Sequence, residues 1–372
     1  MAKGDSFSFR ALVLLTDAFG GVGGIQLYNR DLLTALCAHP GCAEVVAVPR
    51  KVTYSVDALP DKLTYQTDGL AGALAYCRTV MKVMTSGSFD FLVCCHLNLL
   101  PLAWLAANLC RKPLLLVLFG KEAWQPPANP LTKLFLRRVD AFAAISHTTD
   151  ERFRSWAGVH SKTTTLLPNA LHRNQYGPGL KDPALLRRFG LEGKTVLMTF
   201  GRLESFQRQK GFDEVLHILP QLVSEYPDLM YLIAGDGPDK GRLEQEVVRR
   251  GMTERVRFTG MVPEAEKAQY YRLADVYVMP SRKEGFGFVF LEAMACGIPV
   301  IASKSDGSRE AVLYGALGAL VDPGNPDELL DAVRNALRQP RGVVPQGLDY
   351  FSYGNFTRRL HELADKVRGG RA

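Results

Sequence analysis

Short runs of apolar residues alternate along the chain with segments in which apolar residues recur every three or four positions. The runs Arg10–Thr16, Phe91–Cys95 and Leu114–Phe119 are almost continuously apolar, which is typical of strands buried on both faces of a sheet. In Ile25–Cys37 the apolar residues follow helical spacing instead, which predicts an amphipathic helix. This alternation predicts a parallel sheet with helices on both faces.

The alternation pauses once and then resumes. Residues 174–183 are rich in Gly, Pro and polar side chains, as linkers are. We therefore expect an α/β fold of two Rossmann-like, doubly wound parallel-sheet domains at 1–172 and 173–350, with a C-terminal helix at 351–372 that could pack back on the first domain. Ligands of such sheets bind at the carboxyl ends of the strands, so we expect the chemistry in a cleft between the domains.

Composition agrees with a globular protein. Of the 372 residues, 47% are apolar and 22% charged, which excludes a disordered, collagen-like or coiled-coil chain. The net charge of +7 suits an anionic ligand, an anionic membrane or nucleic acid, but no aromatic–basic motif of a nucleic-acid reader is present. The seven cysteines form no CxxC pair, which favours free thiols in a reducing cytoplasm. Phe91–Cys110 is uncharged, yet it divides better into a strand and a helix than into a membrane span.

The segment Glu284–Glu292 (EGFGFVFLE) carries the most specific candidate chemistry. It follows an apolar strand and opens a helix, where free backbone N–H groups and two glycines allow a phosphate to approach closely. Glu284 precedes the helix and Glu292 lies within it, and a carboxylate can accept two hydroxyl hydrogen bonds from a ribose or a hexose. The alternative is a glycine-rich turn that Glu284 caps, with Glu292 in solvent.

Two further loops leave predicted strands. The first is Gly201–Gly211, whose Arg202, Arg208 and Lys210 suit phosphate oxygens, although a solvated basic loop would have the same composition. The second is the glycine-rich turn FGGVGGIQ, which has Gln26 where a dinucleotide fingerprint needs its last glycine and which is not a P-loop. No Asp-x-Asp, HExxH or GxSxG occurs, so we expect neither a metal site nor a serine hydrolase.

Several segments together resemble the family 4 retaining glycosyltransferases of GT-B architecture, in their bacterial polysaccharide and glycolipid branch. They are FGGVGGIQ, GRLESFQRQKGFDEV, IAGDGPDKGRLE, VRFTGMVP, ADVYVMPSRKEGFGFVFLEAMACGIPVIAS and DGSREAV. The resemblance covers nearly the whole chain and is densest over Val196–Pro323. It implies an N-terminal acceptor-binding domain and a C-terminal donor-binding domain.

The resemblance also implies an activity. The protein would be a cytoplasmic, metal-independent, retaining hexosyltransferase that needs no cofactor beyond its GDP- or UDP-sugar co-substrate. Its acceptor would be a saccharide or a lipid-linked saccharide in cell-surface polysaccharide or glycolipid synthesis. The alternative is a nucleotide-sugar epimerase or another non-transferase GT-B enzyme.

The resemblance assigns roles to single residues. Glu284 would bind hydroxyls of the donor sugar and Glu292 those of the ribose. Arg202 and Lys210 would neutralise the diphosphate leaving group, so Glu284, Arg202 and Lys210 are the expected catalytic residues. The other expected donor-binding residues lie at the helix start, near the base and in the N-terminal glycine turn: Gly285, Phe286, Gly287, Phe288, Val289, Gly260, Val262, Glu264, Lys267, Gly23 and Gly24.

The sequence says less about the residues that would bind the acceptor. In much of the family a histidine that contacts the donor sugar stands where this chain has Phe119, so His96, Lys121 and Glu122 are candidate acceptor-binding residues in its place. The alternative for His96 is a buried histidine with a structural role. Pro130–Val139 mixes leucines with Lys and Arg, which suits either an anionic membrane face or an ordinary helix packed on the sheet.

Overall fold

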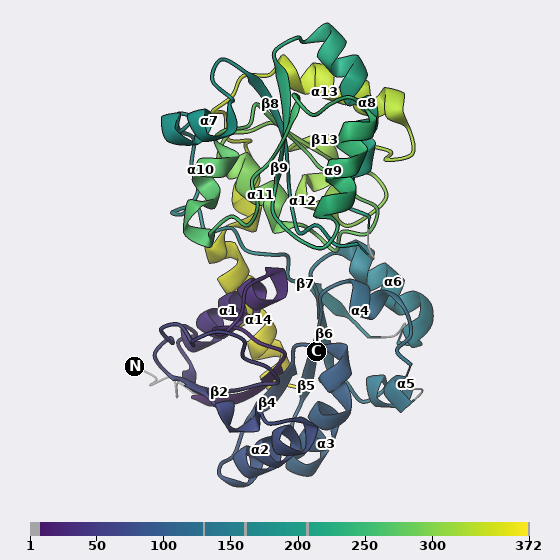
Figure 1. Ribbon diagram of the computed structural model, residues 1–372. Helices are drawn as coiled ribbons and strands as arrows, with labels where there is room; N and C mark the ends of the chain where they lie inside the picture. The colour runs from purple at the N-terminus through teal and green to yellow at the C-terminus, as the bar shows by residue number, and fades with distance from the viewer. Residues whose placement is uncertain (1–7, 129–130, 160–161, 206–207, 371–372) are drawn as a thin grey trace. The chain divides into compact units, whose positions relative to one another are not determined.

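The computed structural model describes residues 8–128, 131–159, 162–205 and 208–370. The chain divides into two compact units, one made of Met1–Ala170 with Tyr353–Ala372 and one of Leu171–Ser352. Each unit is built on its own parallel sheet with helices beside it (Figure 1). The expectation of two α/β parallel-sheet domains is therefore confirmed.

The first unit holds a seven-stranded sheet in the order β3-β2-β1-β4-β5-β6-β7. Its strands are β1 (Phe9–Leu15), β2 (Cys42–Pro49), β3 (Leu63–Tyr65), β4 (Phe91–Cys94), β5 (Leu114–Leu118), β6 (Ala141–Ala144) and β7 (Thr164–Leu166). All their pairings are parallel, and Val13 in β1 faces Ala47 in β2 on one side and Val93 in β4 on the other. Every residue of β4, β5 and β6 is buried, which explains why their sequences are apolar runs without alternation.

The helices of the first unit follow these strands in turn. They are α1 (Gly24–Cys37), η1 (Thr67–Gly69), α2 (Ala73–Thr85), η2 (Leu97–Leu99), α3 (Leu100–Cys110), α4 (Lys121–Trp124), α5 (Leu131–Leu136) and α6 (His147–Ala157). The uncharged stretch of residues 91–110 is β4, η2 and α3, as predicted. In the part of the chain that the structure describes, no helix is long and apolar enough to cross a membrane. The helix expected over residues 130–139 is shorter, since α5 ends at Leu136; Pro130 lies outside the described residues.

The last helix, α14 (Tyr353–Arg368), belongs to the first unit although it ends the chain. It packs against α1, where the ring of Phe356 meets that of Tyr28 at 5.4 Å. The ring of His361 lies 4.5 Å from that of His39, just beyond the end of α1. Apolar positions of α14 such as Leu360 and Leu363 are buried, as the spacing of this segment predicts.

The second unit holds a six-stranded parallel sheet in the order β10-β9-β8-β11-β12-β13. Its strands are β8 (Thr195–Phe200), β9 (Leu229–Ala234), β10 (Val256–Phe258), β11 (Val276–Val278), β12 (Val300–Ser303) and β13 (Ala319–Val321). Its helices are α7 (Pro183–Phe189), α8 (Phe212–Glu225), α9 (Lys240–Arg249), η3 (Glu264–Glu266), α10 (Lys267–Tyr271), α11 (Phe288–Ala295), α12 (Ser308–Ala311), η4 (Leu313–Gly315), α13 (Pro326–Leu337) and η5 (Leu348–Phe351). The central strand β8 lies where the strand order reverses, which is the position that usually binds ligands in such sheets.

Candidate functional site

The turn into α11 follows β11 and is built around glycines. Gly287 precedes the helix with a φ of 96°, in the left-handed region, and a Cβ on it would lie 2.7 Å from the ring of Phe290. Only glycine fits there without strain. No side chain caps the start of α11, so its first backbone N–H groups remain available to a ligand. The ring of Phe286 is buried against Phe351, so Phe286 could offer only its backbone, whereas Phe288 and Val289 are half-buried.

Glu284 and Lys210 meet just before this turn. The Nζ atom of Lys210 donates to Oε2 of Glu284 at 2.8 Å. Burial lowers the pKa of Lys210, but the charges of Glu284 and Asp306 outweigh that effect and leave the pKa above its usual value. Lys210 is therefore a fixed positive charge at neutral pH. It reaches this position across Gly201, where a Cβ would lie 2.8 Å from Cδ of Lys210.

A buried carboxylate, Asp306, holds the Glu284 loop in place. Its Oδ2 accepts the backbone N–H of Glu284 at 2.7 Å and the hydroxyl of Ser281 at 2.8 Å, and its Oδ1 accepts the hydroxyl of Ser308 at 2.6 Å. Burial raises the pKa of Asp306 although these hydrogen bonds oppose the rise. The adjacent Gly307 donates its N–H to the carbonyl of Glu284 at 2.9 Å. The sequence alone did not single out Asp306 as a site residue.

Glu292 is buried, with 2% of its surface exposed, so the alternative of a solvated Glu292 is wrong. Its Oε1 accepts the Tyr176 hydroxyl at 3.0 Å, and its Oε2 accepts the Tyr271 hydroxyl at 2.6 Å. The Nζ of Lys267 lies 3.5 Å from Oε1. Burial, reinforced by the charge of Glu292, raises the pKa of both tyrosines, so both remain hydrogen-bond donors to the carboxylate at any physiological pH.

Lys267 links Glu292 to the residues expected near the base. Its ammonium also contacts Glu264 at 2.9 Å, and these two carboxylates raise the pKa of Lys267 against the opposing effect of burial. The neighbouring Gly260 has a φ of 70° and accepts the N–H of Gly235 at 3.2 Å. Val262 is half-buried and Glu264 is exposed. The structure thus brings Glu264, Lys267 and Glu292 together, as a candidate nucleotide site requires.

In the part of the chain that the structure describes, Arg202 forms an ion pair with neither Glu284 nor Glu292. Its side chain is 76% exposed, and its Nε lies 3.4 Å from Oε1 of Glu204. Residues 206 and 207, in the same basic loop, lie outside the described part of the chain. Backbone hydrogen bonds fix the start of the loop. Leu203 donates its N–H to the carbonyl of Asp236 and accepts the N–H of Asp239, both at 3.0 Å. Arg202 is therefore a cation at the edge of the site.

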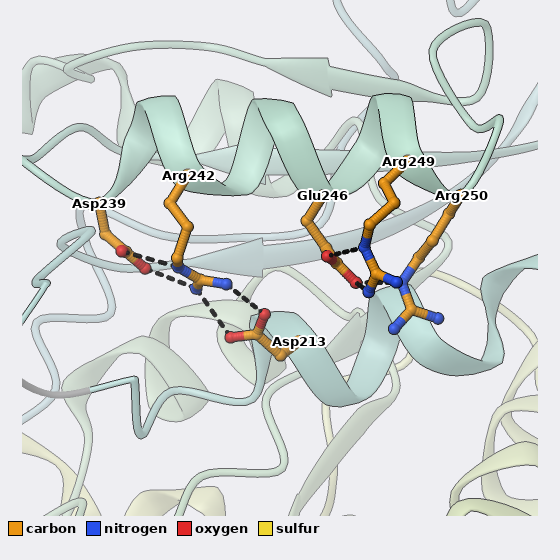
Figure 2. Close-up of polar contacts among 6 residues, drawn as sticks. All are labelled: Asp213, Asp239, Arg242, Glu246, Arg249 and Arg250. Carbon is orange, nitrogen blue, oxygen red and sulfur yellow. Dashed lines mark hydrogen bonds and ion pairs between the residues drawn. The ribbon is translucent and has the colours of Figure 1, made fainter.

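Figure 2 shows Arg242 paired with two acids, Asp239 and Asp213, which adjoin this basic loop. Arg242 of α9 forms ion pairs of 2.6 Å with Asp239, before α9, and with Asp213, in the first turn of α8. Asp239 bonds the beginning of the loop through Leu203, and Asp213 lies just after its end. A second cluster in Figure 2 joins Glu246 to the arginines at 249 and 250, on the same helix. This cluster involves none of the candidate site residues.

The remaining candidates lie in the first unit. Gly23, with a φ of 141°, precedes α1, which begins at Gly24. His96 accepts the N–H of Asn98 through Nδ1 at 3.1 Å, and burial lowers its pKa although Glu122 opposes the shift. Glu122 accepts the N–H groups of Phe119 at 2.7 Å and Gly120 at 3.1 Å through Oε1.

Two neighbours of these candidates differ sharply in exposure. Phe119, at the position of the family histidine, is buried with its ring 5.1 Å from that of Tyr28. Lys121 is exposed. Over the described residues, no group of three or more His, Cys, Asp or Glu side chains is arranged to hold a metal ion. Independence of metal stays a prediction.

Comparison with known proteins agrees with this picture. Residues 187–346 match the family model described as "Glycosyl transferases group 1". The chain is 33% identical over 261 residues to a GDP-mannose-dependent alpha-(1-6)-phosphatidylinositol monomannoside mannosyltransferase of Mycolicibacterium smegmatis, covering 65% of this chain and 67% of the relative. It is 30% identical over 269 residues to a phosphatidyl-myo-inositol mannosyltransferase of Mycobacterium tuberculosis, covering 70% and 66%. The matches thus span about two thirds of these relatives' length.

Among solved structures, HepE of Anabaena in complex with UDP and glucose is similar in fold. Its TM-score is 0.73 at 22% identity, over 96% of this chain and 100% of that one. This likeness confirms the expected GT-B type of fold.

Proposed function

The chain belongs to the glycosyl transferases group 1 family, and from this premise we propose that it transfers a hexose from a nucleoside-diphosphate sugar to a saccharide or lipid-linked saccharide. We propose GDP-mannose as the first donor to test, because one similar enzyme is named as GDP-mannose-dependent and both similar enzymes are named as mannosyltransferases. The transfer would retain the configuration of the sugar and need no metal ion. We place it in the cytoplasm, which suits the free state of all seven cysteines.

The observation that carries the proposal is a pair of charged clusters on the segment 284–292, Lys210 with Glu284 and Lys267 with Glu292. A fixed cation and free N–H groups at a helix start suit a diphosphate. The two carboxylates suit sugar hydroxyls, Glu284 for the donor hexose and Glu292 for the ribose. Fixed charges aimed at a developing negative charge commonly contribute several kcal/mol to lowering a barrier, about 3–4 kcal/mol per group.

In the proposed reaction, the bond between C1 of the sugar and the phosphate oxygen breaks, and a bond between C1 and the acceptor oxygen forms on the same face. The acceptor hydroxyl loses its proton to an oxygen of the departing diphosphate. Lys210 stabilises the charge that collects on that diphosphate, and Arg202 adds a second positive charge from the edge of the site. Together they take the role that a divalent cation has in metal-dependent transferases.

The pair of Glu264 and Lys267 supports a guanine base. Guanine presents N1–H and N2–H donors on one edge, which a single carboxylate can accept together, whereas uracil presents only one such N–H. Glu264 is exposed, lies 2.9 Å from Lys267 and is linked through it to Glu292, the proposed ribose ligand. A base and a ribose bound side by side would therefore meet two carboxylates that share one lysine.

Thermal unfolding with GDP, UDP, ADP and dTDP, each in EDTA, tests the proposal. We expect GDP at about a hundred times its Kd to add roughly 3 kcal/mol of stability. Glu292→Ala should lose most of that gain, while the matched control Glu254→Ala, whose side chain is 89% exposed, should keep it. The proposal fails if no nucleotide raises the unfolding midpoint, or if stabilisation requires a divalent cation. Transfer of labelled mannose from GDP-mannose to a glycolipid extract then tests the acceptor class.

A further inference from the structure

Three neighbouring helices of the first unit carry no acidic residue at all. They are α2, α3 and α5, with the sequences ALAYCRTVMKVMT, LPLAWLAANLC and LTKLFL. α3 contacts both of the others (Figure 1). The rings of Trp104 in α3 and Phe135 in α5 lie 4.9 Å apart and join the two helices. That three contacting helices all lack acids is unusual in a chain of which 38 residues are Asp or Glu.

Large apolar side chains protrude from all three helices. Leu74 in α2 is 75% exposed, Leu109 in α3 is 58% exposed and Leu134 in α5 is 56% exposed. Leu105 precedes Leu109 by one helical turn and Leu131 precedes Leu134 in the same way, and both are also exposed. Single exposed leucines are common on surfaces, but five of them on three contacting helices are typical of an interaction site.

Cations accompany these leucines. Arg78 and Lys82 follow Leu74 at intervals of four residues and so share its stripe of α2. Arg111 follows α3, Lys133 lies in α5, and Arg137 and Arg138 follow α5. All six are exposed. Among the residues that the structure describes, none of the six forms an ion pair with a carboxylate.

The acids nearest to these helices in sequence have other hydrogen-bond partners. Asp68, before α2, accepts the side-chain amide of Gln66 at 2.7 Å. Asp90 accepts the backbone N–H of Arg10 at 2.8 Å, and Asp140 accepts that of Leu114 at 2.8 Å. Glu122 accepts two N–H groups after β5. Among the described residues, these acids therefore form no ion pair with the six cations of this region.

We propose that this basic–leucine face, formed by the exposed leucines and cations of α2, α3 and α5, binds the surface of an anionic membrane. Leucines at the level of the headgroups and cations facing anionic lipids are the two signals that hold a protein on a bilayer without crossing it. Nucleic acid would account for the cations but not for the leucines. The inference goes beyond the proposed transfer reaction, because binding to a bilayer needs neither donor nor acceptor.

Co-sedimentation of the full chain with lipid vesicles tests the proposal. The vesicles are phosphatidylcholine alone and phosphatidylcholine with about one-third phosphatidylglycerol, at low salt and at about 0.5 M salt. We expect binding to the anionic vesicles at low salt, at least tenfold weaker binding to the neutral ones, and partial loss in high salt.

Two matched pairs of variants locate the binding surface. The double variant Arg137→Gln/Arg138→Gln should bind anionic vesicles roughly 25-fold more weakly, at about fivefold per cation. Its control, Arg187→Gln/Arg188→Gln, removes an equal charge from an exposed arginine pair in α7 of the second unit and should bind as the parent does. Leu109→Gln/Leu134→Gln should also weaken binding, whereas Leu180→Gln, at an exposed residue of the second unit, should not.

Several outcomes would overturn the proposal. They are absence of vesicle binding, equal weakening by the two arginine pairs, no effect of the leucine variants, and equally tight binding to duplex DNA. Stabilisation of each variant by GDP is measured alongside. A variant that loses vesicle binding and keeps the GDP response supports the membrane face, and failure of the GDP response in every protein would count against the proposed function alone.

Discussion

The candidate carboxylates of the two units have different kinds of partner. In the second unit, Glu284 pairs with Lys210, and Glu292 accepts two tyrosine hydroxyls beside Lys267. These partners come from loops and helices far apart in the sequence. In the first unit, Glu122 of α4 accepts the N–H groups of Phe119 and Gly120, which directly follow β5. His96 likewise accepts the N–H of Asn98, two residues away.

This difference in hydrogen-bond partners distinguishes residues whose arrangement needs a functional explanation from residues whose arrangement does not. A carboxylate that caps its own loop is explained by local backbone geometry. A buried carboxylate that receives tyrosine and lysine side chains from separate elements costs conformational freedom and desolvation, and such arrangements are concentrated at binding sites. The assignment of donor chemistry to the second unit is thus better founded than the assignment of the acceptor to His96, Lys121 and Glu122, which stays a prediction.

Lys210→Met gives the largest effect that we expect. It removes the cation that would stabilise the diphosphate and leaves Glu284 without that partner, so kcat should fall by about 10²–10³-fold. The matched control is Lys181→Met, which breaks a similarly half-buried pair with Asp275 at 2.7 Å in the same unit. Steady-state rates of sugar transfer measure both variants.

The control separates catalysis from stability. Lys181→Met should lower the unfolding midpoint and leave kcat within about twofold of the parent, because Asp275 lies among none of the candidate site residues. If Lys210→Met retained the parental kcat, the pair of Lys210 and Glu284 would be structural, and the contrast between the two units would lose its basis.

Tyr271→Phe should have an intermediate effect on nucleotide affinity. The variant removes the 2.6 Å hydrogen bond to Oε2 of Glu292 and keeps the ring. A hydrogen bond to a charged group is worth about 1.5–3 kcal/mol, so GDP should bind about tenfold more weakly or worse while kcat changes little. Calorimetric titration with GDP measures the affinity, and KM and kcat are compared in the transfer assay.

Tyr277→Phe is the control for that variant. Tyr277 is also buried, but its hydroxyl donates to the carbonyl of Phe200 at 3.2 Å and not to a carboxylate. It should cost comparable stability and leave GDP affinity unchanged. Equal losses of affinity in the two variants would mean that the tyrosine hydroxyls act through the stability of the sheet and do not position Glu292.

The fold was predictable because it follows from local pattern. Apolar runs such as Leu114–Phe119 mark buried parallel strands, and β5 has every residue buried. The division of residues 91–110 into a strand and a helix also followed from the sequence, since Pro101 and polar residues interrupt the stretch. These features depend on neighbours within a few residues, and sequence reasoning handles such neighbours well.

The site was predictable only where a known motif or charge pattern marked it. Tyr176 reaches Glu292 from 116 positions away, out of a segment that reads as a linker, so no spacing could reveal the contact. Asp306 supports Glu284 from the start of the segment DGSREAV, which contributes to the family resemblance but to which no role was assigned. One signal was present: Glu292 is the only charged residue in the helix FVFLEAMA, and an acid in so apolar a helix is expected to be buried and paired.

The smallest expected effect concerns the pH dependence of stability, which we expect to arise in the first unit. His39 in the first unit is buried and accepts the N–H of Gly41 through Nδ1 at 2.9 Å. Burial and the neighbouring His361 and Arg368 lower the pKa of His39, and Asp365 only partly offsets them. The unfolded chain therefore takes up a proton first as pH falls through the ordinary histidine range near 6.5. Stability is retained above that range and decreases below it.

His39→Gln removes the group that takes up this proton, so the Tm of the variant should depend less on pH. Between about pH 7 and about pH 5.5, the parent should lose a further ~2 °C or less in Tm compared with the variant. His217→Gln, an exposed histidine of α8 in the second unit, should keep the full loss of the parent. If instead His39→Gln followed the parental curve, the packing of His39 against α14 would not depend on its protonation. His96, whose pKa burial also lowers, would then be the next residue to test.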